Sequence, residues 1–190
     1  MSTCFRHIFF CCFLALAVVF QPGTLLARQA TIADIIVTNS ETELLLYFTV
    51  KNCFTDEITA GIQNGIPATF TFYVDLYQVR KGWPDKKLAS HNFNHTLAYD
   101  NPKEEYRITL AEKKQENTVV SNLARAQSLM AEVNGFSAIP LSRLESDRTY
   151  RLKVKAKLAK KTLPMYFHYL IPFSSLWDFD TDWHVLEFRY

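Results

Sequence analysis

The strongest constraint on the fold is an alternation of apolar and polar side chains in residues 68–79, which is regular up to residue 77. The odd positions carry mainly Thr, Tyr and Asp, whereas the even positions carry a run of large apolar groups, namely Phe70, Phe72, Val74 and Leu76. A period of two places successive side chains on opposite faces of a β-strand. The stretch therefore predicts a strand with one face in a hydrophobic core and the other face turned outward.

Further strands are predicted by other stretches with the same period or a high content of β-branched and aromatic residues. They are residues 31–38, 43–51, 87–99, 106–110, 148–158, 165–171 and 183–190. The polar residues 39–42 join the first two stretches, which predicts a hairpin. Residues 82–85, with the sequence Gly-Trp-Pro-Asp, have the composition of a turn.

A first helix is predicted directly after residues 43–51. Thr55 is suited to cap it, and the acidic residues 56 and 57 favour the positive end of the helix dipole. Gly65 suits the position after the last turn, and Pro67 prevents the helix from continuing. The apolar stripe of this short amphipathic helix consists of Phe54, Ile58 and Ile62.

A second helix is predicted to begin at a cap formed by Asn117 or Thr118. Apolar residues then recur at spacings of three and four, as they do on one face of a helix. Gly135 and Pro140 mark its end. The apolar positions of this predicted helix are Val119, Leu123, Ala126, Met130 and Val133.

At least six strands and two helices predict a mainly β (α+β) fold. We expect an antiparallel β-sandwich or a curved sheet, with two short to medium helices inserted between strands. Residues 144–152 are similar to the tyrosine corner of immunoglobulin-like sandwiches, because Tyr150 stands at the start of a predicted strand. An immunoglobulin-like arrangement is therefore among the expected sandwiches.

The amino-terminal residues 1–27 are typical of a secretory signal peptide. Arg6 precedes an unbroken apolar run at residues 8–20, and Ala27 supplies a small residue before a cleavage point. The run is short for a permanent anchor, since a helix that spans a bilayer needs roughly 20 apolar residues. We expect cleavage before Arg28 and a single β-rich exported domain at residues 28–190 in the periplasm. The alternative is an uncleaved anchor in the inner membrane, with the domain facing the periplasm.

Net charge and cysteine content argue against a nucleic-acid partner and against an intramolecular disulfide. The formal net charge is only +2, which argues against a nucleic-acid partner. Three of the four cysteines, Cys4, Cys11 and Cys12, lie in the predicted signal segment. Cys53 alone remains, so the domain cannot form an intramolecular disulfide. A small, partly buried side chain is a better interpretation of Cys53 than an activated thiolate.

Several short motifs follow one another along the chain. The most specific is Gly65-Ile66-Pro67 between a helix and a strand, and the others include Trp83, Tyr106, Trp177 and Trp183. In this order they resemble one bacterial envelope family, called domain of unknown function 4390, over roughly residues 31–190. The resemblance implies an exported, β-rich domain and brings no activity, cofactor or catalytic residue. It implies structural roles for Gly65, Pro67, Trp83 and Tyr106. The segment 178–182 is more acidic than we expect of relatives.

Two surface features are candidate binding sites. The predicted strand at residues 148–158 places a basic row on its outward face, made of Arg151, Lys153, Lys155 and Lys157. Such a row can dock anionic lipid headgroups or an acidic partner, or it can be a solvated face whose lysines discourage strand pairing. Trp177 and Trp183 lie in an aromatic tail that serves either a membrane or protein interface or the closure of the core.

The sequence gives little support for a metal site. Asp178, Asp180 and Asp182 alternate as in a calcium loop, but Trp183 replaces the turn glycine and Arg189 stands where the bidentate Glu belongs. A solvated acidic turn is the better interpretation. His91 and His95 would lie about 13 Å apart on a strand, too far to share one ion. We expect no cofactor.

The chain contains no Gly-x-Ser-x-Gly, His-Glu-x-x-His, phosphate-loop or dinucleotide motif, so no residue is assigned a catalytic role. The favoured hypothesis is a non-catalytic periplasmic interaction module that binds an envelope protein, an inner-membrane partner or the membrane surface. Membrane association through the amino-terminal segment is included in this hypothesis. One alternative is a periplasmic sensory domain for a small ligand or metal. Another is a hydrolase built from scattered carboxylates and histidines: His91, His95, His168 and His184.

Overall fold

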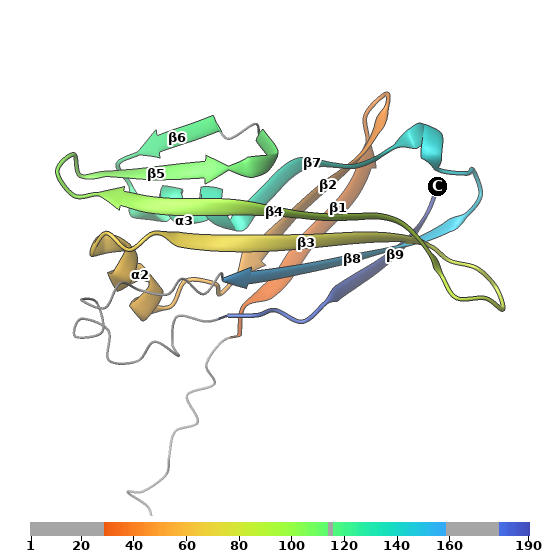
Figure 1. Cartoon of the computed structure of the whole chain (residues 1–190), viewed down its shortest axis with the longest axis horizontal. Coiled ribbons are helices and arrows are strands. Elements are labelled where there is room, and N and C mark those ends of the chain that lie inside the picture. Colours follow the sequence, from red (N-terminus) through yellow and green to blue (C-terminus); the bar gives the residue numbers. More distant parts are fainter. Residues whose placement is uncertain (1–28, 114–115, 159–178) are drawn as a thin grey trace, which may run out of the picture.

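Two antiparallel sheets pack against each other as a β-sandwich in the computed structural model, which describes residues 29–113, 116–158 and 179–190 (Figure 1). In the described part of the chain, the smaller sheet has the order β1-β2-β7 and the larger sheet has the order β6-β5-β4-β3-β8-β9. This confirms the predicted mainly β sandwich. The strands are β1 (Thr31–Asn39), β2 (Glu43–Lys51), β3 (Ala68–Gln78), β4 (Lys86–Asp100), β5 (Glu105–Leu110), β6 (Glu116–Val120), β7 (Glu132–Pro140), β8 (Thr149–Leu158) and β9 (His184–Arg189).

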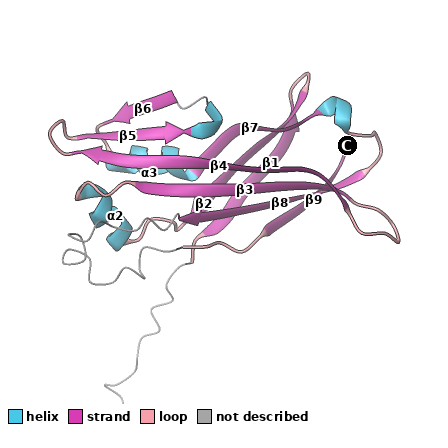
Figure 2. Ribbon diagram, viewed as in Figure 1, coloured by secondary structure: helices cyan, strands magenta, loops and turns pink. Residues whose placement is uncertain are grey.

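The alternating stretch at residues 68–79 forms β3, which lies between β4 and β8 in the large sheet (Figure 2). Its even-numbered apolar side chains are fully buried, and its odd-numbered side chains are only partly buried. The two neighbouring strands follow the same pattern in register, because Phe72 pairs with Phe93 on one side and with Ala156 on the other. The large sheet therefore has an apolar inner face and a polar outer face.

Aromatic side chains join the two sheets across the core. Phe48 on β2 meets Phe72 on β3 with ring centroids 5.7 Å apart. Phe136 on β7 stacks on Phe93 of β4 at 4.5 Å. Such pairs add specific geometry to the burial of their large apolar area, and they fix how the small sheet sits on the large one.

The first predicted helix is α2 (Asp56–Gln63), and its cap is the expected one. The Thr55 side-chain oxygen accepts a hydrogen bond from the Ile58 amide at 3.3 Å. Ile58 and Ile62 are buried against the core. Gly65 follows with φ +83°, a conformation that residues with a Cβ rarely adopt, and its amide donates to the Ile62 carbonyl at 2.9 Å.

The second predicted helix is wrong at both ends. Residues 116–120 form β6, the helix is only α3 (Leu123–Ala131), and the chain continues directly into β7. Val119 pairs with β5 and Val133 pairs with Phe48 of β2. Apolar residues three and four apart fit one long helix, but they also fit a strand, a short helix and a second strand in succession. The pairing of β6 with β5 and of β7 with β2 favours the second arrangement. Asn122, rather than Asn117 or Thr118, caps the helix by accepting from the Arg125 amide at 2.9 Å.

Two short 3-10 turns complete the described elements, η1 (Ala111–Lys113) and η2 (Leu141–Arg143). The Tyr150 hydroxyl accepts from the Glu145 amide at 2.7 Å and donates to the Glu145 carbonyl at 3.2 Å. This is the contact expected of a tyrosine corner. The predicted strand at residues 165–171 lies outside the described residues. None of the described helices has the length and hydrophobicity needed to cross a membrane.

Candidate functional site

The four candidate cations of the basic row lie together on the outer face of the large sheet. Along β8 they alternate with buried Leu152, Val154 and Ala156. In the sheet register they lie beside the outer residues of β3, so that Lys155 faces Tyr73 and Lys153 faces Asp75. The row consists of Arg151, Lys153, Lys155 and Lys157.

Acidic side chains neutralise most of this basic row. Lys155 Nζ lies 2.7 Å from Asp180 Oδ1, and Lys157 Nζ lies 3.6 Å from Asp180 Oδ2. Arg151 pairs with Asp85 and, at 2.7 Å, with Glu187. The hydrogen bond from Lys155, with the lysine charges, holds the pKa of Asp180 below its usual value. The row is thus a set of partly solvated ion pairs rather than a free cationic stripe.

Lys153 has no carboxylate partner among the described residues and lies over an aromatic ring instead. Its Nζ is 5.2 Å from the centroid of Tyr77. Lys155 Nζ lies 6.0 Å from the Trp183 ring, which is 43% exposed and meets Tyr73 at a centroid distance of 6.5 Å. The structure therefore places Trp183 on the outer face beside the basic row. Trp177 lies outside the described residues.

The acidic tail segment is tied to β8 through Thr181. The Thr181 side-chain oxygen accepts from the Ala156 amide at 3.0 Å, and the Thr181 amide donates to the Ala156 carbonyl at 3.0 Å. Asp180 then points to the lysines, whereas Asp182 is exposed. Asp178 lies outside the described residues. Within the described residues, no group of three or more His, Cys, Asp or Glu side chains is arranged to hold a metal ion.

The two histidines of β4 point into the sandwich, on the same face of the strand. His91 Nε2 donates to the Ala138 carbonyl of β7 at 2.7 Å. His95 Nδ1 donates to the Met130 carbonyl, near the end of α3, at 2.9 Å. Because a carbonyl only accepts, these bonds fix one proton on each ring. Both histidines therefore fasten the large sheet to the layer that carries α3 and β7.

Glu112 completes a buried polar pair that the sequence analysis missed. Both of its carboxylate oxygens lie 3.0 Å from His95 Nε2, with side-chain exposures of 0% for His95 and 6% for Glu112. Burial raises the pKa of Glu112, but the hydrogen bond and charge of His95 outweigh burial and lower it. No spacing in the sequence signals this contact, because η1 brings Glu112 to the ring through the tertiary fold.

Cys53 is a buried residue, as the sequence indicates. Its side chain is 3% exposed, and Sγ donates to the Val50 carbonyl at 3.3 Å. Burial raises the pKa of the thiol to about 12, and the backbone hydrogen bond offsets only part of this effect. The thiol is therefore protonated at neutral pH and does not act as a nucleophile.

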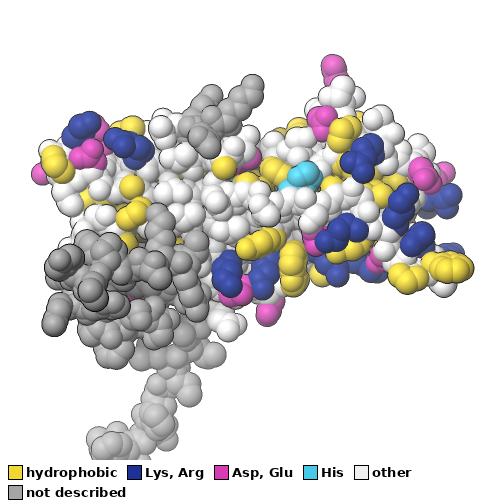
Figure 3. Space-filling view, viewed as in Figure 1, with side chains coloured by type: hydrophobic (Ala, Val, Ile, Leu, Met, Phe, Trp, Pro, Cys, Tyr) yellow, Lys and Arg dark blue, Asp and Glu magenta, His cyan; other side chains and the backbone are white. Residues whose placement is uncertain are grey.

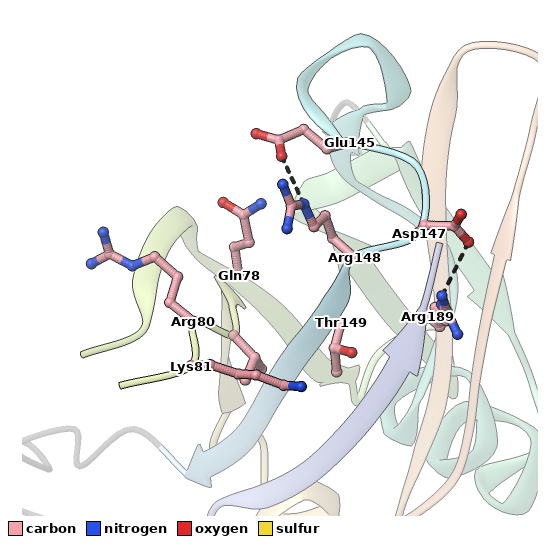
Figure 4. Close-up of a pocket in the computed structure, with 9 residues that line it drawn as sticks. Gln78, Arg80, Lys81, Glu145, Asp147, Arg148, Thr149 and Arg189 are labelled. Carbon is pink, nitrogen blue, oxygen red and sulfur yellow. Dashed lines mark hydrogen bonds and ion pairs between the residues drawn. The ribbon is translucent and has the colours of Figure 1, made fainter. Parts of the chain in front are cut away.

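An open hollow of about 790 Å³ lies at the end of the sandwich that carries the β3–β4 loop (Figure 4). Arg80 and Lys81 of that loop line it, together with Arg189 from the end of β9. Arg148 pairs with Glu145 at 3.1 Å, and Arg189 pairs with Asp147 at 3.3 Å. The full lining is Gln78, Val79, Arg80, Lys81, Glu145, Asp147, Arg148, Thr149 and Arg189.

This hollow belongs to a larger basic end, which we define as residues 79–86, 143–149 and Arg189. Sequence analysis missed it because its charges come from three separate segments. In the space-filling view, Lys and Arg side chains gather at this end and hydrophobic side chains project at its tip (Figure 3). A local signal was present in the β3–β4 loop, where Trp83 stands between basic residues.

The residues of the family motif occupy different surroundings. Gly65 has a positive φ, and a Cβ built there would lie 3.3 Å from the Asn101 side chain. Pro67 is half-buried at the entry to β3, and Tyr106 is buried with its ring centroid 4.6 Å from Tyr99. Trp83, in contrast, is 75% exposed at the tip of the β3–β4 loop.

A comparison with known protein families gives one match, to a family described as Domain of unknown function (DUF4390), over residues 27–187. The chain belongs to this family. The match confirms the resemblance seen in the sequence, and it covers the described strands of the DUF4390 sandwich up to Glu187 in β9. No curated protein and no solved structure matches the chain. The family description names no activity, so the function of the DUF4390 domain has to be argued from its own residues.

Proposed function

We propose that this DUF4390 domain is an exported, non-catalytic interaction module of the bacterial envelope, which binds an envelope protein or the membrane surface. One observation carries the proposal: exposed cations gather around an exposed tryptophan at one end of the sandwich. Trp83 is 75% exposed there. Large exposed aromatic groups beside uncompensated charge are typical of interaction surfaces.

The charge balance of the basic end supports this proposal. Its side chains comprise six cations and three carboxylates, so the surplus is three positive charges, whereas the whole chain has a net charge of only +2. The rest of the chain is therefore slightly acidic. A local surplus of this kind attracts an anionic surface even when the total charge is small. The cations are Arg80, Lys81, Lys86, Arg143, Arg148 and Arg189, and the carboxylates are Asp85, Glu145 and Asp147.

The surroundings of the histidine and carboxylate side chains support a non-catalytic role. A hydrolase would need a histidine and a carboxylate together in a cleft that admits substrate. His95 and Glu112 are within hydrogen-bond distance, but both side chains are buried and both His95 nitrogens are occupied by protein partners. His91 is bonded to the backbone, His184 is exposed on β9, and His168 lies outside the described residues.

The sensory alternative receives less support from the hollows of the surface. A sensory domain for a small ligand would need a deep pocket lined by several aromatic side chains. The hollow at the basic end is lined mainly by charged and polar residues. A smaller hollow of about 130 Å³, between residues 29–32 and 180–184, is lined by one tryptophan, Trp183, and by no phenylalanine or tyrosine among the described residues.

Export is part of the proposal and rests on the short apolar run at residues 8–20. Sequencing the amino terminus of the chain purified from the cell envelope tests it directly. Arg28 as the first residue is the expected result. Met1 as the first residue would support the anchored alternative, and recovery of the chain only from the cytoplasm would contradict export.

Site-specific photo-crosslinking in living cells tests the interaction surface. A photoreactive amino acid replaces Trp83 in one strain and Ile36 in a control strain, because Ile36 is 58% exposed on β1 of the other sheet. We expect a reproducible envelope adduct, protein or lipid, at position 83 and not at position 36. Equal adduct patterns at the two positions, or none at position 83, would overturn the proposal.

A further inference from the structure

We propose that the basic end docks on an anionic phospholipid bilayer, with Trp83 entering the headgroup region and the surrounding cations contacting lipid phosphates. This inference rests on the proposed function and names the partner of that surface. It also moves the contact away from the basic row of β8, whose charges are largely paired with Asp180, Asp85 and Glu187.

The first observation is that the β3–β4 loop holds Trp83 outward. The Arg80 guanidinium donates two hydrogen bonds to the Pro84 carbonyl, from Nε at 3.0 Å and from Nη2 at 2.6 Å. These bonds brace the turn across Trp83. Gly82 has φ +74°, and a Cβ placed on it would meet no atom within 4 Å, so the tip stands free of the rest of the domain. A braced turn can present an indole ring to a membrane without a large ordering cost.

The second observation is that the cations beside Trp83 keep their charge available. Lys81 and Lys86 are exposed and have no carboxylate partner within the described residues. Asp85, the acidic residue of the loop, is already paired with Arg151 on the outer face. Among the residues that the structure describes, the Arg143 guanidinium donates only to the Leu88 carbonyl, at 3.0 Å. The loop therefore presents positive charge on both sides of the indole.

The hollow of Figure 4 supplies a place for lipid phosphate groups next to this tip. It is bordered by Arg80, Lys81, Arg148 and Arg189. The two ion pairs at its rim, Arg148 with Glu145 and Arg189 with Asp147, join side chains that are each more than 60% exposed. Exposed pairs of this kind are weak, so a phosphate can compete for these guanidinium groups.

The distribution of exposed apolar side chains favours a bilayer over a folded protein as the partner of the basic end. Six large hydrophobic side chains are exposed in the described residues, and only Trp83 and Tyr190 lie beside the basic end. The Tyr190 amide donates to the Arg148 carbonyl at 3.1 Å, which places this residue next to the hollow. A stable protein interface needs a contiguous apolar centre, whereas a membrane surface selects isolated Trp and Tyr rings flanked by Lys and Arg.

The test measures binding of the full chain to vesicles of phosphatidylcholine alone and to vesicles in which a third of the lipid is phosphatidylglycerol. Each surface lysine contributes about fivefold to partitioning on an anionic bilayer, so Lys81→Gln with Lys86→Gln should weaken binding about 25-fold. Trp83→Ala should weaken it by at least about tenfold, through the lost burial of the indole. All variants share residues 1–27, so any contribution of that segment is common to them.

Matched controls remove equal groups elsewhere. Lys51→Gln with Lys103→Gln removes two exposed lysines far from the loop in sequence, and Ile36→Ala removes an exposed apolar side chain from β1. These variants should bind within about twofold of the parent chain. Circular dichroism and thermal unfolding of every variant verify that the fold is retained. Equal binding by the Lys81/Lys86 variant and the parent chain would overturn the inference.

A second measurement reports the position of the indole itself. Vesicles with brominated acyl chains quench tryptophan fluorescence, and the parent chain is compared with Trp83→Phe, which retains two other tryptophans. We expect stronger quenching in the parent chain, by the share that Trp83 contributes. Identical fractional quenching in the two proteins would show that Trp83 does not enter the bilayer and would overturn the inference.

Polyglutamate provides an arm that separates this inference from the broader proposal. Binding of polyglutamate but not of anionic vesicles, with the same dependence on Lys81 and Lys86, would assign the surface to an acidic protein segment. That result would overturn the lipid assignment and leave the interaction module standing. Binding to anionic vesicles that disappears at about 1 M salt, where the Debye length is near 3 Å, supports the lipid assignment.

Discussion

The buried pair of His95 and Glu112 and the ion pairs on the outer face of the large sheet each join an acidic side chain to a basic one, but in opposite surroundings. Glu112 contacts His95 at 3.0 Å with almost no solvent, whereas Asp180 contacts Lys155 at 2.7 Å with side-chain exposures of 43% and 23%. Removing one partner of a buried pair leaves an uncompensated polar group, but water replaces a lost partner at the surface. The comparison teaches that the interior polar groups maintain the fold and the surface groups are free to exchange partners.

The largest effect is expected for Glu112→Ala. Loss of the carboxylate leaves His95 Nε2 without a partner in the core, which should lower the free energy of unfolding by about 3–5 kcal/mol. Urea denaturation measures it. Glu41→Ala, at an exposed position in the β1–β2 turn, should change stability by less than about 0.5 kcal/mol. If the two variants lose the same stability, the buried pair does not stabilise the packing of η1 against β4.

Lowering the pH should remove the part of the folding stability that depends on the charged Glu112 carboxylate. The variant Glu112→Gln measures that part. The folded pKa of Glu112 lies below its ordinary value of 4.5, so the carboxylate stabilises the fold above that pH and its contribution is lost as the pH falls through the folded pKa. The stability difference between the parent chain and Glu112→Gln should therefore be largest above pH 4.5 and narrow below it. Urea titrations at a series of pH values measure the difference. A difference that stays constant into strong acid would contradict this prediction.

A smaller effect is expected at the tyrosine corner. Tyr150→Phe removes two hydrogen bonds between the hydroxyl and the Glu145 backbone and leaves the buried ring in place. The expected loss is about 1–2 kcal/mol, measured by urea denaturation. Tyr73→Phe on the outer face is the matched control and should have no comparable effect. A loss at Tyr150 no greater than at Tyr73 would show that the corner contributes nothing beyond ring packing.

The smallest effect is expected for Asp180→Asn on the outer face. Its partners Lys155 and Lys157 can turn to water, so the loss should stay below about 1 kcal/mol. Thermal unfolding at low salt and at about 1 M salt measures it, and the difference from the parent chain should shrink at high salt. A loss as large as that of Glu112→Ala, or one insensitive to salt, would erase the distinction between the two regions.

Local patterns predicted those parts of the fold whose cause is local. The alternation of Phe70, Phe72, Val74 and Leu76 identified β3, and the Thr55 cap identified α2, because side-chain period and capping act over a few residues. The helix expected at residues 117–133 was wrong because β6 and β7 pair with strands that are distant in the sequence. Strand pairing outweighed a pattern that fits more than one local structure.

The candidate site was predicted less well than the fold, also for a physical reason. The period of β8 correctly placed its four cations on one outer face, but their acidic partners come from the β3–β4 loop, β9 and the tail. No sequence spacing records such contacts. The same holds for Glu112 and for the basic end, where Arg80, Arg148 and Arg189 meet only after the sandwich has formed.

The position of β3 between β4 and β8 has a consequence for the order of folding. Its first neighbour follows it directly in the chain, but its second neighbour begins only at Thr149. Closing so long a loop costs entropy before it yields contacts, which slows folding. During synthesis, one edge of β3 therefore stays unpaired until the last quarter of the chain has been made. The pairing of β8 is the step that seals the core, and a chain truncated before Thr149 would present that open edge to other molecules.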